Sequence, residues 1–199
     1  MNRLRILSAA TLLICLGNLS TQAKDWPMWR YDAGRTAESP QELPADMELL
    51  WQRKLPPPKP AFNDVRLQFD GGYEPVVKGS NLFLASNVED HVTAFDTATG
   101  RQIWRFFTDG PVRLAPVAWQ DSVLFGSDDG HLYCVSAADG KLRWKFQAVP
   151  SDRRLLGNKR LISVWPIRGG GVLQGGRVYF AAGVWPFEGV FIYCLDAAT

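Results

Sequence analysis

The histidines and cysteines are the residues best suited to metal or redox chemistry, and their spacing argues against a shared site. His91 and His131 are the only histidines, and they stand 40 positions apart, each at the start of a similar apolar run. Zinc–histidine bonds are about 2.0–2.1 Å long, whereas equivalent positions on neighbouring packed sheets lie roughly 10 Å apart. We therefore predict that both histidines lie at turn edges and that they hold no common metal.

The same geometry applies to two of the three cysteines. Cys134 and Cys194 each follow a tyrosine in similar apolar runs, so about 10 Å should separate them on neighbouring sheets. A disulfide needs Cα atoms roughly 4.4–6.8 Å apart. We predict that both cysteines are small buried apolar side chains rather than a disulfide pair.

No catalytic motif stands out in the sequence. The glycines at 169–171 and 175–176 lack the lysine and hydroxyl residue of a phosphate-binding loop, and a tight strand with a hairpin turn at 175–176 explains them better. Neither Gly-x-Ser-x-Gly nor His-Glu-x-x-His occurs. Catalytic and metal-ligating residues are therefore not assigned, and an enzymatic function is uncertain and less favoured than a binding function.

Arginines and large aromatics gather in three expanded connections, residues 56–74, 148–168 and 183–189. Arg113 and Arg168 each stand three residues before an expected innermost strand of the ring-shaped fold that the repeat below predicts. We therefore expect both to point into the mouth of the channel at the centre of that ring. Arginine forks bind carboxylates and phosphates bidentately, so an acidic protein loop or an anionic glycan is the expected partner. A lid that merely covers a wide ring is the alternative. The candidate binding face comprises Arg66, Arg113, Arg153, Arg154, Arg160, Arg168, Trp165, Trp185 and Phe187.

A repeat of about 40 residues determines the expected fold. Gly100 and Gly140 are 40 positions apart, as are Trp104 and Trp144, and each tryptophan follows its glycine by four positions. Each copy contains four short β-type runs separated by turn residues, and a third copy begins near residue 166. Four antiparallel strands per 40 residues are typical of a β-propeller blade. We predict an all-β fold, a β-propeller of four-stranded antiparallel blades, and expect its tryptophans to pack between blades.

The expected boundaries follow from this repeat. Residues 1–23 form a signal peptide, 24–46 an N-terminal extension and 47–199 a partial propeller. Within the propeller, residues 47–55 resemble a fourth strand without its first three and are expected to close the ring, residues 73–107 and 112–147 form blades, and residues 166–199 form an incomplete blade. Because propellers usually have 4–8 blades, these roughly three blades suggest part of a longer ring.

Charge and the N-terminal segment indicate the compartment. Arg3 and Arg5 precede an apolar run at 6–16 and the small residues Thr21 and Ala23, a pattern typical of a secretory signal peptide cleaved near Ala23. Eleven apolar residues are too few to span a membrane, which needs about 20. The whole chain has 22 basic and 20 acidic residues, a formal charge of +2, which does not favour nucleic-acid binding. We predict a secreted or periplasmic protein that does not span the membrane.

The segments 92–106 and 132–146 resemble the pyrrolo-quinoline quinone (PQQ) repeat, and residues 25–36 resemble the start of secreted bacterial propellers of that group. This resemblance implies a β-propeller that serves as a BamB-like binding or assembly scaffold. Alternatives are the propeller of a quinoprotein oxidoreductase, which would bring PQQ and calcium, and a glycan- or cell-wall-binding module using Trp165, Trp185 and Phe187. The adjacent cysteine pair of quinoprotein alcohol dehydrogenases and a Cys-x-x-Cys-His haem motif are both missing, so no cofactor position is transferred.

Overall fold

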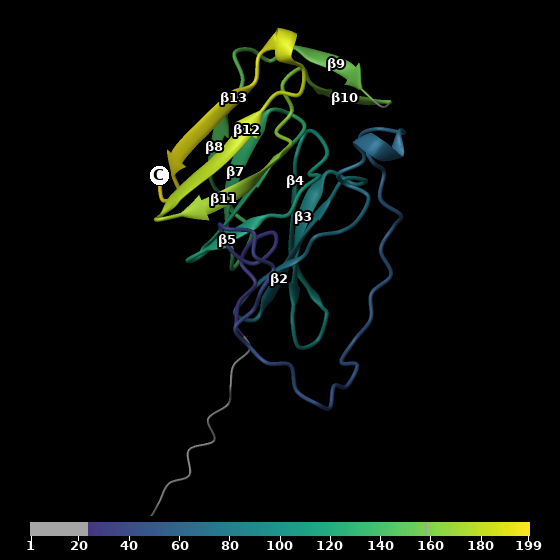
Figure 1. Cartoon of the computed structure of the whole chain (residues 1–199), viewed down its shortest axis with the longest axis vertical. Coiled ribbons are helices and arrows are strands. Elements are labelled where there is room, and N and C mark those ends of the chain that lie inside the picture. The colour runs from purple at the N-terminus through teal and green to yellow at the C-terminus, as the bar shows by residue number, and fades with distance from the viewer. Residues whose placement is uncertain (1–23, 158) are drawn as a thin grey trace, which may run out of the picture.

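The computed structural model describes residues 24–157 and 159–199; the expected signal peptide lies outside them. The fold is all-β, with four-stranded antiparallel sheets arranged as blades of a partial propeller (Figure 1), which confirms the expected class. The first blade has the order β1-β2-β3-β4 and the second β5-β6-β7-β8, while the third sheet has the order β11-β12-β13. The strands β1 to β4 of the first blade are Val76–Lys78, Asn81–Ser86, His91–Asp96 and Gln102–Phe107. The strands β5 to β8 of the second blade are Val117–Trp119, Ser122–Gly126, His131–Ser136 and Leu142–Gln147. The strands β11 to β13 of the third sheet are Gly169–Gln174, Arg177–Ala182 and Phe191–Asp196.

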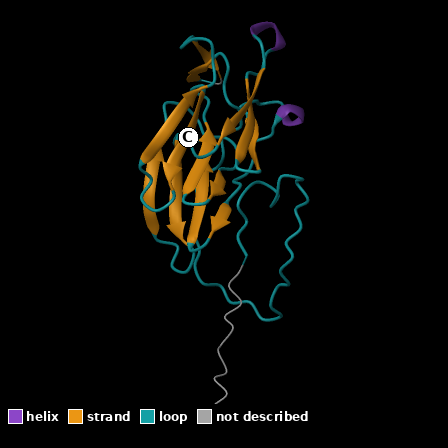
Figure 2. Cartoon of the chain, turned by 90° about the vertical axis from the view of Figure 1, so that its left-hand side faces the viewer, coloured by secondary structure: helices purple, strands orange, loops and turns teal. Residues whose placement is uncertain are grey.

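Two short helices and one hairpin supplement the blades. The hairpin consists of β9 (Arg154–Gly157) and β10 (Arg160–Ser163), and it occupies the connection between the second blade and the third sheet. The 3-10 helices η1 (Val65–Leu67) and η2 (Pro186–Glu188) lie at one end of the blades (Figure 2). No helix in the described ranges is long and apolar enough to cross a bilayer.

Tryptophan side chains lock neighbouring blades together at glycine turns. The Trp104 ring lies against Gly140, where an added Cβ would be 2.7 Å from the ring, and its Nε1 donates to the Ala137 carbonyl at 2.9 Å. Trp51 makes the same contact at Gly100, at 2.6 Å. Both glycines have left-handed backbones, with φ of 68° and 70°, which side chains adopt at a cost. The repeated glycine-to-tryptophan spacing therefore results from a packing contact between blades, as expected.

Apolar side chains on alternating strand positions form a core between each pair of sheets, as a period of two requires. Between the first two blades, the Phe125 and Tyr133 rings stack 5.7 Å apart and Phe106 meets both edge-on. Between the second blade and the third sheet, Phe180 and Tyr193 stack and Phe146 meets them edge-on. Aromatic pairs of this kind add about 0.5–1.5 kcal/mol beyond their buried area, so the sheets form one continuous scaffold.

The third sheet begins with the glycine-rich run. Gly169–Gln174 pairs with Arg177–Ala182, and the turn between them places Gly175 and Gly176 at φ of 57° and 76°. A left-handed pair of this kind needs glycine. The predicted strand and hairpin turn are therefore confirmed. Trp144 differs from Trp51 and Trp104, because its buried Nε1 has no hydrogen-bond partner among the described residues.

Candidate binding site on the loop face

Three connections meet at one end of the blades, and we call this end the loop face: residues 56–74, the β9–β10 hairpin and residues 183–189 (Figures 1 and 2). The expanded connections in the sequence predicted this meeting. The hairpin itself was not predicted. The loop face therefore brings together segments that are more than 100 residues apart in the chain.

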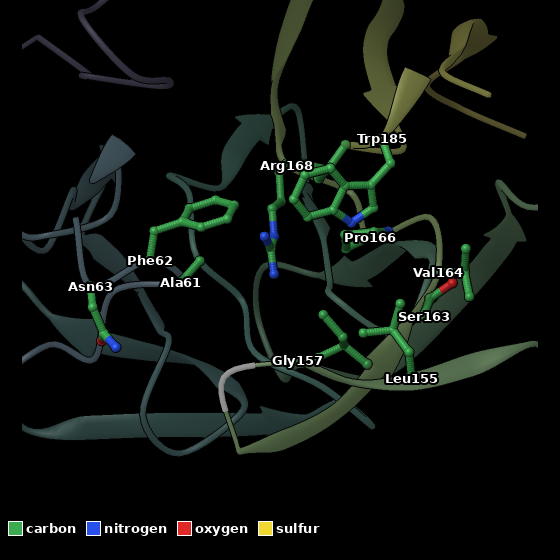
Figure 3. A pocket seen from close by; sticks show the side chains of 12 residues that line it. Ala61, Phe62, Asn63, Leu155, Gly157, Ser163, Val164, Pro166, Arg168 and Trp185 are labelled. Atoms are coloured by element: carbon green, nitrogen blue, oxygen red, sulfur yellow. The ribbon is translucent and has the colours of Figure 1, made fainter. Parts of the chain in front are cut away.

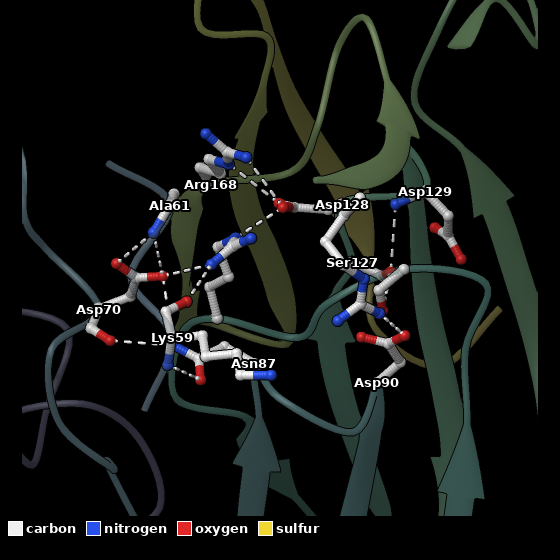
Figure 4. A network of polar contacts seen from close by, with 12 residues as sticks. Lys59, Ala61, Asp70, Asn87, Asp90, Ser127, Asp128, Asp129 and Arg168 are labelled. Atoms are coloured by element: carbon white, nitrogen blue, oxygen red, sulfur yellow. Dashed lines mark hydrogen bonds and ion pairs between the residues drawn. The ribbon is translucent and has the colours of Figure 1, made fainter. Parts of the chain in front are cut away.

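A buried ion-pair network forms the floor of the loop face (Figure 4). Arg113 lies between two aspartates, with its Nη1 2.6 Å from Asp70 Oδ2 and its Nε 2.6 Å from Asp128 Oδ2. Arg168 donates through Nε and Nη2 to the two oxygens of Asp128, both at 2.9 Å. The Arg113 side chain is 2% exposed and both carboxylates are fully buried. Two arginines therefore balance two aspartates, one from the 56–74 loop and one from the β6–β7 turn.

The network attaches the 56–74 loop to the blades. Asp70 accepts the backbone N–H of Ala61 and the side-chain amide of Asn87, while Arg113 donates to the Lys59 carbonyl. Burial opposes the charge of Arg113, but Asp128 and Asp70 outweigh it and raise the pKa of the guanidinium. Buried charges are tolerated only when they are paired and hydrogen-bonded in this way. The loop is therefore held by charge pairing as well as by packing.

This pairing corrects the expectation that Arg113 and Arg168 present free guanidinium groups at a channel mouth. Both do lie side by side, as their equivalent positions predicted, but their donors are directed at Asp128 and Asp70. Neither Asp70 nor Asp128 was indicated as a partner by the sequence around the two arginines. Asp128 stands in the β6–β7 turn, and such turns open toward the same face as the connections between blades, which was the signal that could have identified it.

Three further arginines of the candidate face are also paired. Arg66 bonds Asp64 at 2.7 Å, Arg153 bonds Glu188 and Arg160 bonds Asp90. For Arg154, which is exposed, the structure shows no ion pair within the described ranges. The face is thus less cationic than the sequence suggested, and binding of an anion to it stays a prediction.

Trp165 has a structural role that the sequence did not predict. Its side chain is buried, its Nε1 donates to the Glu188 carbonyl at 2.6 Å, and the Arg153 guanidinium lies 5.2 Å from the centre of its ring. These contacts hold the 183–189 loop against the hairpin. Trp165 is therefore not available for stacking on a ligand.

Trp185 lines a pocket of about 310 Å³ together with Phe62 and Arg168 (Figure 3). Trp185 meets Phe62 edge-on at 6.5 Å and stacks on Phe187 at 6.2 Å, and Arg168 lies between the Trp185 and Phe62 sides of the pocket. Trp185 is 43% exposed and Phe187 is 82% exposed. The hairpin side is lined by the apolar residues Leu155, Ile162 and Val164. The pocket therefore suits an apolar or aromatic group.

A second pocket, of about 410 Å³, lies beside the innermost strands and is lined by Trp29, Arg35 and Glu74 among others. Arg35 donates to the carbonyls of Trp29 and Gly171, and Glu74 accepts the Ala115 N–H at 3.1 Å. Burial raises the pKa of Glu74. Calcium takes six to eight oxygen ligands, and a single carboxylate lines this pocket. The residues that line this pocket therefore do not by themselves fit a calcium-bound PQQ.

The histidines and cysteines lie apart from both pockets. His91 and His131 are the first residues of β3 and β7, as predicted, and no metal-binding group of histidine, cysteine and acidic residues is found within the described ranges. Both thiols are free. Cys134 is buried as expected, but Cys194 is exposed, because no described residues cover the outer face of β13.

Comparison with known proteins places this geometry in a family. The family model described as "Outer membrane protein assembly factor BamB" matches residues 43–185. A polyvinylalcohol dehydrogenase of a Pseudomonas species is 26% identical over 151 residues, which is 69% of this chain and 24% of that protein. The dehydrogenase subunit of a quinone-type alcohol dehydrogenase from Gluconobacter oxydans (strain 621H) is 27% identical over 101 residues, covering 45% of this chain and 13% of that protein.

Among solved structures, the quinohemoprotein alcohol dehydrogenase of Comamonas testosteroni superposes with a TM-score of 0.63 and 23% identity, covering 89% of this chain and 26% of that one. The chain thus spans about a quarter or less of the length of these relatives. The superposition on the Comamonas enzyme shows a shared fold. From the family match, the chain belongs to the PQQ-repeat propellers whose family model carries the BamB description.

Proposed function

We propose that the chain is part of a secreted or periplasmic binding scaffold whose loop face takes up an apolar segment of a protein partner. The observation that carries this proposal is the contrast on the loop face between paired arginines and exposed apolar side chains. Phe187, Trp185 and the cross-strand pair Leu156 and Leu161 are all exposed, while five of the six candidate arginines are ion-paired.

Energetics favour an apolar contact at this face. Exposed apolar patches rimmed by polar residues commonly mark interaction sites, and aromatic anchors contribute most at interfaces. An anionic partner would have to displace Glu188 from Arg153 or Asp90 from Arg160 before it could bind those guanidinium groups. An acidic protein loop or an anionic glycan therefore stays a weaker prediction, served mainly by Arg154, which has no ion pair within the described residues.

A capture experiment tests this function. Immobilised protein carrying Phe187→Ser and Leu156→Ser should lose most of the periplasmic protein that the unmodified chain retains. Ile103→Ser with Leu142→Ser is the matched control, because both residues are exposed apolar side chains at the start of β4 and β8, at the opposite end of the blades. Equal loss in the control would point to non-specific adhesion and contradict the proposal.

The second candidate function is the propeller of a quinoprotein oxidoreductase. It is favoured by the names of the curated relatives and by the superposition on the Comamonas enzyme. PQQ and calcium would then be required, and the remaining ligands would have to come from outside the described residues. Alcohol-dependent dye reduction by the protein after incubation with PQQ and calcium, abolished by a chelator, would establish this function in place of the scaffold.

A further inference from the structure

A third pocket lies on the loop face, and its lining is cationic. Its volume is about 530 Å³, and Lys59, Arg113, Lys159 and Arg160 contribute to its walls. None of the described residues that line it is acidic. Lysine and arginine side chains donate hydrogen bonds and accept none. This cationic pocket therefore suits an anionic group, in contrast to the apolar pocket lined by Trp185.

Two lysines give the cationic pocket its uncompensated charge. Arg160 is paired with Asp90, and Arg113 belongs to the buried network, where two arginines balance two aspartates. Lys59 and Lys159 are both exposed, and neither forms an ion pair with any residue that the structure describes. Unlike Arg160, these ammonium groups can therefore bind an anion without displacing an aspartate.

The cationic and apolar pockets share their walls. Asn63 lines both pockets, and it lies next to Phe62 of the apolar pocket (Figure 3). Lys59, which is earlier in the same loop, lines the cationic pocket. On the hairpin side, Gly157 lines the apolar pocket and Lys159 the cationic one. Three residues of chain span at most about 10–11 Å, so the pockets are close enough for one short segment of a partner to occupy both.

We propose that the partner segment carries an acidic side chain within about three residues of its apolar anchor. The anchor enters the apolar pocket, and Lys59 and Lys159 bind the neighbouring carboxylate in the cationic pocket. This inference rests on the proposed function, since it specifies the chemistry of the same partner. Neither lysine belongs to the arginine-based candidate face, so the acidic group is recognised at a site that the sequence did not indicate.

The two pockets contribute differently to binding. Apolar anchors in desolvated pockets supply most of the affinity at interfaces, whereas charges at a rim act on specificity and association rate. An exposed ion pair is weak, so the two lysines together should strengthen binding about 2–30-fold. Salt screens exposed charges, so this gain should largely disappear at about 0.5 M sodium chloride. The lysines therefore select among apolar segments rather than hold them.

Selection from a random peptide library tests the pairing of anchor and acid. Linear peptides displayed on phage are selected on the immobilised chain, and the recovered sequences should combine an aromatic or aliphatic residue with aspartate or glutamate within about three positions. On Lys59→Gln with Lys159→Gln, the apolar preference should remain and the acidic preference should be lost. Lys54→Gln with Lys145→Gln is the matched control, because both lysines are exposed and line neither pocket.

The outcomes separate this inference from the proposed function. Apolar sequences without an acidic preference, or an acidic preference that survives in the double lysine variant, would contradict the inference and leave the loop-face function standing. No apolar preference, or one that persists in Trp185→Ser, would contradict the proposed function itself. For a recovered peptide, fluorescence polarisation should show binding weakened about 2–30-fold in the double lysine variant and unchanged in the control. Equal weakening at low and high salt would contradict a role for the lysine charges.

Discussion

Replacing Arg113 with alanine removes the centre of the buried network. Three hydrogen bonds are lost, two at 2.6 Å to Asp70 and Asp128 and one at 3.1 Å to the Lys59 carbonyl. Arg168 still pairs with Asp128, so the surplus negative charge falls on Asp70. Breaking a buried pair by removing one partner typically costs about 3–5 kcal/mol, which is a large share of a total stability of about 5–15 kcal/mol.

Equilibrium unfolding in urea at pH 7, followed by tryptophan fluorescence, measures this loss. Arg66→Ala is the matched control, because its ion pair with Asp64 is on a side chain that is 85% exposed and should contribute about 0–1 kcal/mol. Adding Asp70→Asn to Arg113→Ala removes the surplus charge and keeps an oxygen for the Ala61 N–H, so part of the stability should return. A loss below about 1 kcal/mol for Arg113→Ala, or a further loss in the double variant, would refute the reasoning.

Two further changes probe the blades. Gly140→Ala places a Cβ 2.7 Å from Trp104, whereas the Cβ of Gly175→Ala meets nothing within 4 Å at a similar positive φ. In urea unfolding, both variants should lose about 1–2 kcal/mol of unfolding free energy from backbone strain, and Gly140→Ala should lose a further 1–3 kcal/mol from the clash with the ring. Equal losses in the two variants would contradict the packing role assigned to Trp104. Burial lowers the pKa of His91 in the folded protein. As the pH falls, this histidine is therefore protonated in the unfolded chain before it is protonated in the folded chain. The free energy of unfolding should decrease as the pH drops below about 6.5, by at most about 1.4 kcal/mol per pH unit. His91→Asn should flatten the profile between pH 7.5 and 5.5, and an unchanged slope would show that another group titrates there.

The repeat could be predicted because it depends on local chemistry. Gly100 and Gly140 must adopt left-handed turns, and the following tryptophan must cover the next turn, so a fixed spacing appears in the sequence. Strand alternation likewise comes from a period of two. The fold class, the hairpin at Gly175 and Gly176, and the packing role of Trp104 were therefore accessible without coordinates.

The floor of the candidate site was not accessible in the same way. Arg113 and Arg168 were placed together correctly, but Asp70 lies 43 positions before Arg113 in an irregular loop, and no local pattern assigns its direction. Similarly, the burial of Trp165 depends on the Glu188 carbonyl 23 residues away. Which arginines are free to bind a ligand depends on pairing with residues that are distant in the sequence. Sequence spacing does not indicate that pairing.

Site-specific photocross-linking in cells tests the loop-face function most directly. A benzophenone amino acid in place of Phe187 should yield a discrete cross-linked protein band, because this side chain is the most exposed aromatic of the loop face. The same amino acid in place of Leu142, at the opposite end of the blades, should yield none. A band at 142 without one at 187, or none at either position, would contradict the proposal that the loop face is the binding surface.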